Sequence, residues 1–408
     1  MPETPPEGLD SGSSAPDGPK RKGKSRRKHT VMKVIAITVV LLALVTGMTV
    51  TYAYRHLNGN LTTLDVTGTF VEPPLDKVKA EGPKDPLNIL VMGSDSREGE
   101  GNNIDGLTGS GQRSDTTILL HLAADRKRAY GISVPRDSLV ERPDCKDGDG
   151  DVIPGASDVM WNEAFNLAGP GCTISQFEQT TGVPVDHYVV LDFQGFQDMV
   201  DAVDGVPVCI PETIDDREHG IYLEAGTREI SGKEALSYVR QRYAVGDGSD
   251  IGRLKRQQAF MSAMANKVIS AGTLANPVTL VRFLNAATKS LTVDTGLGNL
   301  SKLAKLGYQF KDIGLSKIQF STIPWEYTAD RNRVVWAEPA AQDVWDRIRN
   351  DEPLTPQQTS DAISAGDVPS TGSTSSSGKS DKPSKSPTSS PSGNAAAEEE
   401  AAAAGLCT

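Results

Sequence analysis

Hydrophobic and polar positions divide the chain into one long apolar run, a mixed region and two polar ends. The apolar run, residues 34–54, reads VIAITVVLLALVTGMTVTYAY and contains no charged residue. Its length matches the roughly 20 residues that cross the hydrocarbon of a bilayer. The run is therefore predicted to form one transmembrane helix.

A cleaved signal peptide is the alternative interpretation of this run. Signal peptides have a shorter apolar core, roughly 7–15 residues, and end in a small-residue cleavage site. Thr-Tyr-Ala at residues 51–53 matches such a site poorly. The pattern favours an uncleaved signal-anchor.

Lysines and arginines crowd residues 20–33, directly before the apolar run. Such an excess marks the cytoplasmic side of a span. Residues 1–33 are therefore predicted to be a disordered, basic cytoplasmic arm, and the rest of the chain to be exported. The whole chain has a net charge of −11, and its acidic excess lies in the exported part, which argues against a nucleic-acid surface.

Between residues 86 and 350, short apolar runs alternate with helical patterns. Strands are predicted at residues 87–92, 116–122, 129–134, 188–191, 206–210 and 317–323. Helices are predicted at residues 193–203, 232–239, 251–269, 276–286, 298–306 and 338–349. This alternation predicts one α/β domain with a central mixed sheet flanked by helices.

The segments on either side of this domain lack the apolar residues for a core. Residues 55–85 are predicted to be an extracytoplasmic linker. Residues 351–408, rich in Ser, Pro, Gly and Ala, are predicted to be a disordered tail.

The four cysteines fit export. Cys145 and Cys172 bracket a Gly/Asp/Pro-rich excursion, and a disulfide is predicted between them. Cys209 lies in an apolar strand and is predicted to be a buried thiol, while Cys407 has no evident partner. Because no Cys/His metal spacing occurs, a zinc site is not expected.

Asp and Arg residues gather where predicted strands begin or end. The motifs are GSDSR at 93–97, RSD at 113–115 and PRDS at 135–138. Ligands of α/β proteins usually bind at one edge of the sheet, beyond the strand ends. These motifs therefore predict a site that includes Asp95, Arg97, Arg113, Asp115 and Arg136.

A further cluster surrounds the start of the helix predicted at 251–269. Arg240 and Arg242 are two apart, so in extended chain both side chains point the same way. Asp250 is predicted to cap the helix, and Arg253 and Gln257 share one face. Arginine pairs bidentately with phosphate oxygens, whereas carboxylates need a cation such as Mg²⁺ between them and phosphate. A pyrophosphate–Mg²⁺ complex suits this set.

Surface Asp–Arg pairs, worth ~0–1 kcal/mol each, are the simpler explanation for any one of these residues. Arg126, Lys127 and Arg128 are interpreted as solvated turn charges, and Arg256 is expected to face water. The joint placement of the other residues favours a ligand site.

Seven motifs occur in an order that resembles a known family. They are GSDSR (93–97), RSDT (113–116), SVPRDS (133–138), WNEAF (161–165), DHY (186–188), RQR (240–242) and DIGRLKRQQ (250–258). Over residues 86–269 the chain resembles the LytR–CpsA–Psr (LCP) family of bacterial cell-wall proteins.

The resemblance implies an α-β-α sandwich that binds a polyprenyl pyrophosphate lipid. It implies transfer of a glycopolymer phosphate from that lipid to peptidoglycan, at the outer face of the cell membrane in a Gram-positive-type envelope. Asp95 and Asp115 match the family's Mg²⁺ (or Mn²⁺) ligands, and Asp137 and Asp250 are assigned supporting roles. The residues that match phosphate-contacting positions are Arg97, Arg113, Arg136, Arg240, Arg242, Arg253 and Gln257.

A membrane-anchored phosphotransferase is thus the leading hypothesis. The walls of a lipid tunnel are expected from residues 193–203 and the long helix. Two rival functions remain: a non-catalytic lipid-binding sensor and a lipid pyrophosphatase. Teichoic acid, capsule and arabinogalactan are equally compatible as the glycopolymer.

Overall fold

A computed structural model describes residues 25–77, 82–94, 114–217, 220–242, 245–270, 273, 276–367, 401–402 and 404–407. The chain divides into two compact units, Met1–Arg55 and His56–Thr408. The predicted apolar run lies within one helix, α1 (Ser25–Gly59). Its Thr30–Gly59 part reaches a mean hydropathy of 2.4 and is long and apolar enough to cross a membrane.

The globular unit is built on an eight-stranded mixed sheet with the order β1-β14-β9-β2-β3-β4-β15-β18. β2 runs antiparallel to β3 and parallel to β9, and β4 runs parallel to β15. This confirms the predicted fold class. The strands are β1 (Thr62–Thr63), β14 (Leu291–Val293), β9 (His187–Leu191), β2 (Leu87–Ser94), β3 (Ser114–Leu122), β4 (Ala129–Val134), β15 (Ile318–Thr322) and β18 (Ile363–Ser364).

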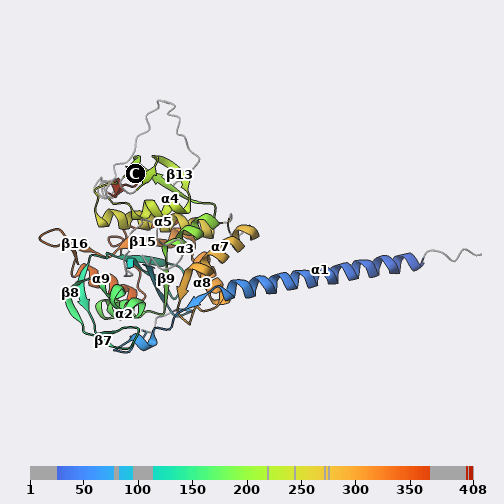
Figure 1. Cartoon of the computed structure of the whole chain (residues 1–408), viewed down its shortest axis with the longest axis horizontal. Coiled ribbons are helices and arrows are strands. Elements are labelled where there is room, and N and C mark those ends of the chain that lie inside the picture. The colour runs from blue at the N-terminus through green and yellow to red at the C-terminus, as the bar shows by residue number, and fades with distance from the viewer. Residues whose placement is uncertain are drawn as a thin grey trace, which may run out of the picture. The chain divides into compact units, whose positions relative to one another are not determined.

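Helices cover both faces of this sheet because successive strand residues point to opposite sides. Leu90 and Met92 join a cluster with Trp161 and with aromatic residues of α2 (Glu163–Thr181) and α9 (Ala340–Arg349). Ile89 on the opposite face packs with residues of α5 (Asp250–Ile269) and α8 (Leu300–Ile313). Figure 1 shows α5 on one side of the sheet and α2 and α9 on the other.

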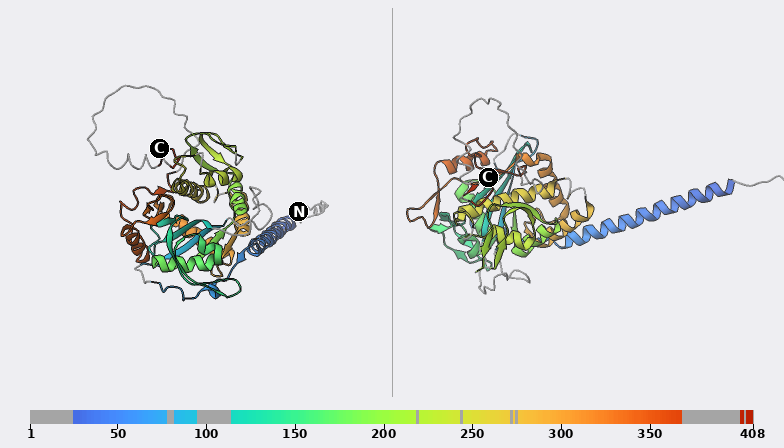
Figure 2. Two further views of the ribbon diagram at one scale, coloured as in Figure 1. Left: turned by 60° about the vertical axis from the view of Figure 1, so that its left-hand side comes forward. Right: turned by 90° about the horizontal axis from the view of Figure 1, so that it is seen from above.

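A second core lies beyond α5. It joins α3 (Phe193–Ala202), α4 (Gly232–Arg240) and the two-stranded sheet of β10 (Val206–Ile210) and β13 (Gly226–Ile230). This small sheet and α4 come into view together with α5 in the right panel of Figure 2. The remaining elements are α7 (Pro277–Ser290), η1 (Thr67–Thr69), η2 (Leu315–Lys317), β5 (Leu139–Arg142), β6 (Cys145–Lys146), β7 (Val152–Ile153), β8 (Ala156–Met160), β11 (Ile214–Asp216), β12 (Ile221–Leu223), β16 (Trp325–Tyr327) and β17 (Val334–Trp336).

The predicted linker, residues 55–85, is largely part of the fold. β1 pairs in parallel with β14 at the sheet edge, Val66 is buried in the main core, and Lys77 forms an ion pair with Asp186. The pairing of β1 with β14 is made by backbone groups, so the polar side chains of this segment do not indicate it. Helix α2 was also missed, because Gly169 (φ 66°) and Pro170 interrupt its pattern with a kink.

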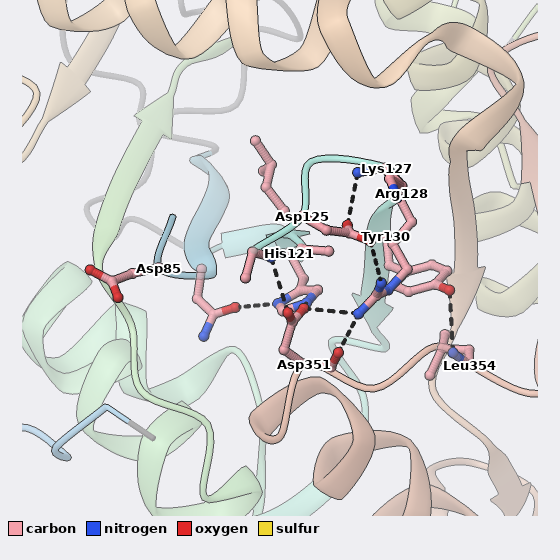
Figure 3. Close-up of polar contacts among 12 residues, drawn as sticks. Asp85, His121, Asp125, Lys127, Arg128, Tyr130, Asp351 and Leu354 are labelled. Carbon is pink, nitrogen blue, oxygen red and sulfur yellow. Dashed lines mark hydrogen bonds and ion pairs between the residues drawn. The ribbon is translucent and has the colours of Figure 1, made fainter. Parts of the chain in front are cut away.

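The folded unit also continues past Asn350, where the sequence pattern placed a disordered tail. The Asp351 carboxylate contacts His121 Nε2 at 3.1 Å and accepts from Ala124 N and Arg128 Nη2 (Figure 3). Leu354 N donates to the hydroxyl of Tyr130 at 3.2 Å. Further along, β18 pairs with β15. These are isolated anchor residues in a polar segment, so composition did not predict them.

Two disulfides join described residues. Cys145 and Cys172 are bonded, as the sequence predicted. Cys209 is also bonded, to Cys407, with 5.8 Å between their Cα atoms. The interpretation of Cys209 as a buried thiol is therefore wrong. The bond between these two cysteines could not be predicted from the sequence because they lie 198 positions apart.

Candidate functional site

Several strands of the central sheet end at the same edge. Gly93 near the end of β2 is opposite Thr116 near the start of β3, and parallel β9 brings Leu191 beside Gly93. Thr117 of β3 is opposite Val134, the last residue of β4. The Asp115 and Arg136 motifs therefore converge at this edge, as their positions at strand ends predicted.

A cavity of about 330 Å³ opens at this edge, between the sheet and helices α3, α4 and α5. Polar groups lie at the strand ends and helix ends. Val91 and Ile118, a register pair two residues deeper than Gly93 and Thr116, continue the lining with apolar side chains. The cavity is lined by Val91, Gly93, Asp115, Thr116, Ile118, Arg136, Leu191, Asp192, Phe193, Phe196, Leu236, Val239, Arg240, Arg242, Arg253, Gln257, Phe260 and Met261.

The structure brings together every predicted site residue that it describes. Six of them line the cavity: Asp115, Arg136, Arg240, Arg242, Arg253 and Gln257. The other three, Asp95, Arg97 and Arg113, lie outside the described residues.

Asp250 is the common anion of the arginine cluster. Its Oδ1 lies 2.8 Å from Arg253 Nη2 and 3.3 Å from Arg136 Nε, and it accepts a hydrogen bond from Arg242 Nη2. Arg136 donates in turn to Asp115. One carboxylate thus holds three guanidinium groups together at the mouth of the cavity, which agrees with a supporting role for Asp250.

Local structure explains why Arg253 and Gln257 reach the same cavity. They are one turn apart on α5, and Phe260 and Met261 continue that face toward the apolar end. Ser249, not Asp250, caps the helix by accepting from Gly252 N at 2.9 Å. Asp250 is the first helical residue, which leaves its carboxylate available to the arginines. Arg240 ends α4 and stacks over the Phe193 ring at 4.6 Å.

Burial perturbs the ionisable groups of this cluster. Burial lowers the pKa of Arg253, and the Asp250 carboxylate offsets this only in part. At Arg136 burial also favours the neutral form, but Asp115 and Asp250 outweigh it and raise its pKa. Burial, followed by the charge of Asp250, raises the pKa of Asp137. The arginines stay cationic, whereas the ionised form of Asp137 is disfavoured.

Several buried donors of this cluster have no hydrogen-bond partner among the described residues. They are Nε of Arg136, Nε of Arg242, and Nε and Nη2 of Arg253. Arg136 Nε and Arg253 Nη2 lie within ion-pair distance of Asp250 Oδ1 but lack hydrogen-bond geometry. Leaving a charged donor unsatisfied costs more than the ~1–3 kcal/mol of a neutral one. Buried, cationic and incompletely bonded donors at a cavity mouth are suited to binding an anion with several oxygens, such as a phosphate.

The model of the LytR_cpsA_psr family matches residues 54–350. The chain belongs to this family. It is 30% identical over 324 residues to the cell wall biosynthesis protein LcpA of Corynebacterium glutamicum, a match that covers 72% of this chain and 60% of LcpA. It is 30% identical over 261 residues to TagT of Bacillus subtilis, named a polyisoprenyl-teichoic acid–peptidoglycan teichoic acid transferase, covering 62% of this chain and 75% of TagT.

The fold agrees with that of a solved family member. The LytR-Csp2A-Psr enzyme from Actinomyces oris superposes with a TM-score of 0.53 at 20% identity, covering 74% of this chain and 98% of that enzyme. At this identity the likeness concerns the fold.

The described part of this site could hold a divalent cation only if the substrate supplied some of the metal ligands. Asp115 lines the cavity, and Arg136 donates to one of its oxygens. Asp192 lines it too, but its Oδ1 accepts from Gly195 N at 2.7 Å to cap α3. Among the residues with described positions, no cluster of three or more metal-ligating side chains occurs. Mg²⁺ is usually held by one or two carboxylates together with substrate phosphates, so Asp115 fits a metal completed by the substrate.

Three arginines outside the cavity lie in surroundings that differ from those predicted. Arg126 donates to Gln309 and to backbone carbonyls, and Arg128 contacts Asp351, so neither is a free turn charge. Arg256 is 1% exposed rather than facing water. Each has a partner far away in sequence, which spacing alone cannot show.

The apolar lining was predicted only in part. The segment 193–203 and the long helix do contribute, through Phe193, Phe196, Phe260 and Met261. Leu236 and Val239 of α4 were not foreseen. Their helical spacing is the same whether they line a cavity or fill a core, so the sequence carried no signal for this difference.

Proposed function

We propose that this protein transfers a glycopolymer phosphate from a polyprenyl pyrophosphate lipid to peptidoglycan. The single observation that carries the proposal is the group of buried, incompletely hydrogen-bonded guanidinium groups at the mouth of a cavity with an apolar interior. A lipid pyrophosphate has the matching division between anionic oxygens and hydrocarbon. The names of relatives support it, since TagT is named a teichoic acid transferase and has been solved bound to LIIa-WTA.

In the proposed reaction an acceptor hydroxyl of peptidoglycan attacks the phosphorus next to the glycopolymer. The proton of the hydroxyl passes to water, the bond to the bridging oxygen breaks, and the lipid phosphate leaves with the developing negative charge. Phosphoryl transfer depends on positioning and charge stabilisation more than on a protein nucleophile. Arg136, Arg242 and Arg253, aligned by Asp250, are placed to bind and stabilise the phosphates. Bound Mg²⁺ held by Asp115, and by Asp95 as the family motif implies, would neutralise part of this charge.

The lipid tail is proposed to lie along Phe196, Leu236 and Phe260, deeper in the cavity. Helix α1 is proposed to anchor the chain in the membrane that carries this lipid, with the basic arm in the cytoplasm. The two disulfides support an exported domain, because disulfides persist in oxidising compartments. A reporter enzyme fused after Thr408 should be active only outside the cytoplasmic membrane, and activity only inside would refute this orientation.

The test of function uses the full chain in liposomes with a lipid-linked glycopolymer and peptidoglycan. Transfer predicts glycopolymer covalently attached to peptidoglycan, detected by mass spectrometry. Release of free phosphate without attachment would instead support a lipid pyrophosphatase, and tight binding without either product would support a sensor. Arg253→Met should lose product. Arg282→Met is the matched control, because Arg282 is exposed and pairs with Asp204 away from the cavity lining.

A further inference from the structure

Residues 401–402 and 404–407, here termed the clasp, lie beside Cys209 of β10 and Tyr238 of α4. In Figure 1 the red segment at the end marked C lies close to the strands of the small sheet, to which Cys407 is bonded through Cys209. Leu406 N donates to Ala401 O and Gly405 N to Ala402 O, both at 2.9 Å, which forms a closed turn. Gly405 has a φ of +70°, and a Cβ there would lie 2.2 Å from Val245 Cγ1. The turn is therefore shaped to fit against Val245.

The clasp buries a small apolar surface: among its described residues Ala404 is 2% exposed but small, and Leu406 is only partly buried. A further interaction is therefore needed to hold it. The disulfide from Cys407 to Cys209 on β10 provides that attachment. The disulfide closes a long loop, which restricts the unfolded chain and keeps the turn in place.

Arg256 connects the clasp to the phosphate-facing segment. Its Nη1 donates to Ala404 O at 2.6 Å, and its Nη2 donates to Gln241 O. Among the described residues its hydrogen bonds go only to these two carbonyls. A buried guanidinium held by two backbone carbonyls fixes the positions of both backbones, since the planar group presents its donors in a rigid geometry.

Gln241 lies between Arg240 and Arg242, which both line the cavity. The backbone N of Gln241 donates to Ser237 O at 3.0 Å, and its side-chain Nε2 donates to Asp216 at 2.8 Å. The carbonyl held by Arg256 is the remaining backbone group of this residue. Its orientation sets the peptide plane that leads into Arg242, and hence the direction of the Arg242 side chain.

We propose that Arg256 is a positioning residue: together with the clasp locked by Cys209–Cys407, it orients the 240–242 backbone so that Arg242 and Arg240 face the cavity. The arrangement makes completion of the phosphate site depend on a disulfide between residues 198 positions apart. This inference rests on the proposed function only in taking the cavity ligand to be a phosphate.

The first measurement is backbone-amide exchange of residues 239–242 in the full chain in detergent, followed by mass spectrometry. Cys407→Ser and Arg256→Met should each speed exchange there and leave β2 and β3 unchanged. Reduction of folded wild-type protein with a phosphine reductant should do the same, which covers the case of a variant that fails to fold. Unchanged exchange in all three would overturn the positioning role, whatever the cavity binds.

The second measurement is the affinity for inorganic pyrophosphate by calorimetry. Arg256→Met and Cys407→Ser should each weaken it about tenfold, the scale of one misplaced charge-assisted contact, and the double variant should be no worse than Arg256→Met. The matched control removes the other disulfide, Cys145→Ser with Cys172→Ser, and should lower the melting temperature without changing this affinity.

The two measurements separate the possible failures. Full additivity of the two variants, or an equal affinity loss in the control, would show general destabilisation and refute the proposed coupling. If wild-type protein does not bind pyrophosphate, the proposed function fails, and the exchange experiment still decides the role of Arg256.

Discussion

The substitution Asp250→Asn tests whether one carboxylate organises the arginine cluster. Asparagine keeps the shape and one acceptor oxygen but removes the charge shared by Arg136, Arg242 and Arg253. A hydrogen bond to a charged acceptor exceeds one to a neutral acceptor by about 1 kcal/mol. The Arg242 hydrogen bond thus accounts for about 1 kcal/mol. The ion pairs with Arg136 and Arg253, at a side chain that is 15% exposed, add about 1 kcal/mol each, so the free energy of unfolding should fall by about 3 kcal/mol.

Asp137→Asn is the matched control. Asp137 lies in the same cluster, but its carboxylate is 4.0 Å from Arg136 Nε, which is a long ion-pair contact. Burial raises the pKa of Asp137. A raised folded-state pKa means that folding disfavours the ionised form, so loss of this charge does not remove net stability at neutral pH. The expected change is within about 0.5 kcal/mol.

Thermal unfolding of the full chain in detergent at pH 7 measures both variants, with the fluorescence of the fully buried Trp161 and Trp345 as the signal. At roughly 2 °C for each kcal/mol in a domain of this size, Asp250→Asn should lower the melting temperature by about 6 °C. Equal melting temperatures for the two variants would refute the organising role of Asp250.

Three further outcomes follow from the structure. Arg253→Met should weaken pyrophosphate binding about 10–100-fold in calorimetry, because a charge-assisted contact is worth about 1.5–3 kcal/mol. An unchanged affinity would show that Arg253 does not bind the ligand. Leu236→Trp should block a long polyprenyl phosphate but not inorganic pyrophosphate, as the added ring occupies the apolar part of the cavity, and equal loss of both ligands would contradict this division. Burial raises the pKa of Asp351, but hydrogen bonds from His121 and Ala124 outweigh it and lower the pKa overall. Asp351→Asn should therefore cost about 2 kcal/mol at pH 7, and this difference in denaturant unfolding should shrink as the pH falls below the ordinary Asp value of about 3.9; a difference independent of pH would argue against the ion pairs.

The sheet and the site were predictable for the same reason. Strands such as 87–92 are buried on both faces and therefore have continuous apolar runs, and the motifs around Asp115 and Arg136 lie directly at strand ends. Parallel and antiparallel pairing then brings those ends to one edge. Local sequence thus located the strands and the motifs at their ends.

The parts that were missed depend on pairing between distant segments. β1 and β18 are two-residue strands held by backbone bonds, which leave no side-chain pattern. Cys407 reaches Cys209, and Arg256 reaches Ala404, across intervals with no periodicity that could reveal them. Helix α2 is interrupted by a kink at Gly169 and by Pro170, which break the helical pattern of its sequence.

A structure of the full chain purified from membranes with a polyprenyl pyrophosphate would show directly whether a lipid phosphate occupies this cavity. Phosphate oxygens should lie within hydrogen-bonding distance of Arg136 and Arg253, with the tail beside Phe196 and Phe260. Phosphates bound elsewhere on the domain, with the arginine cluster left paired only to Asp115 and Asp250, would contradict this prediction.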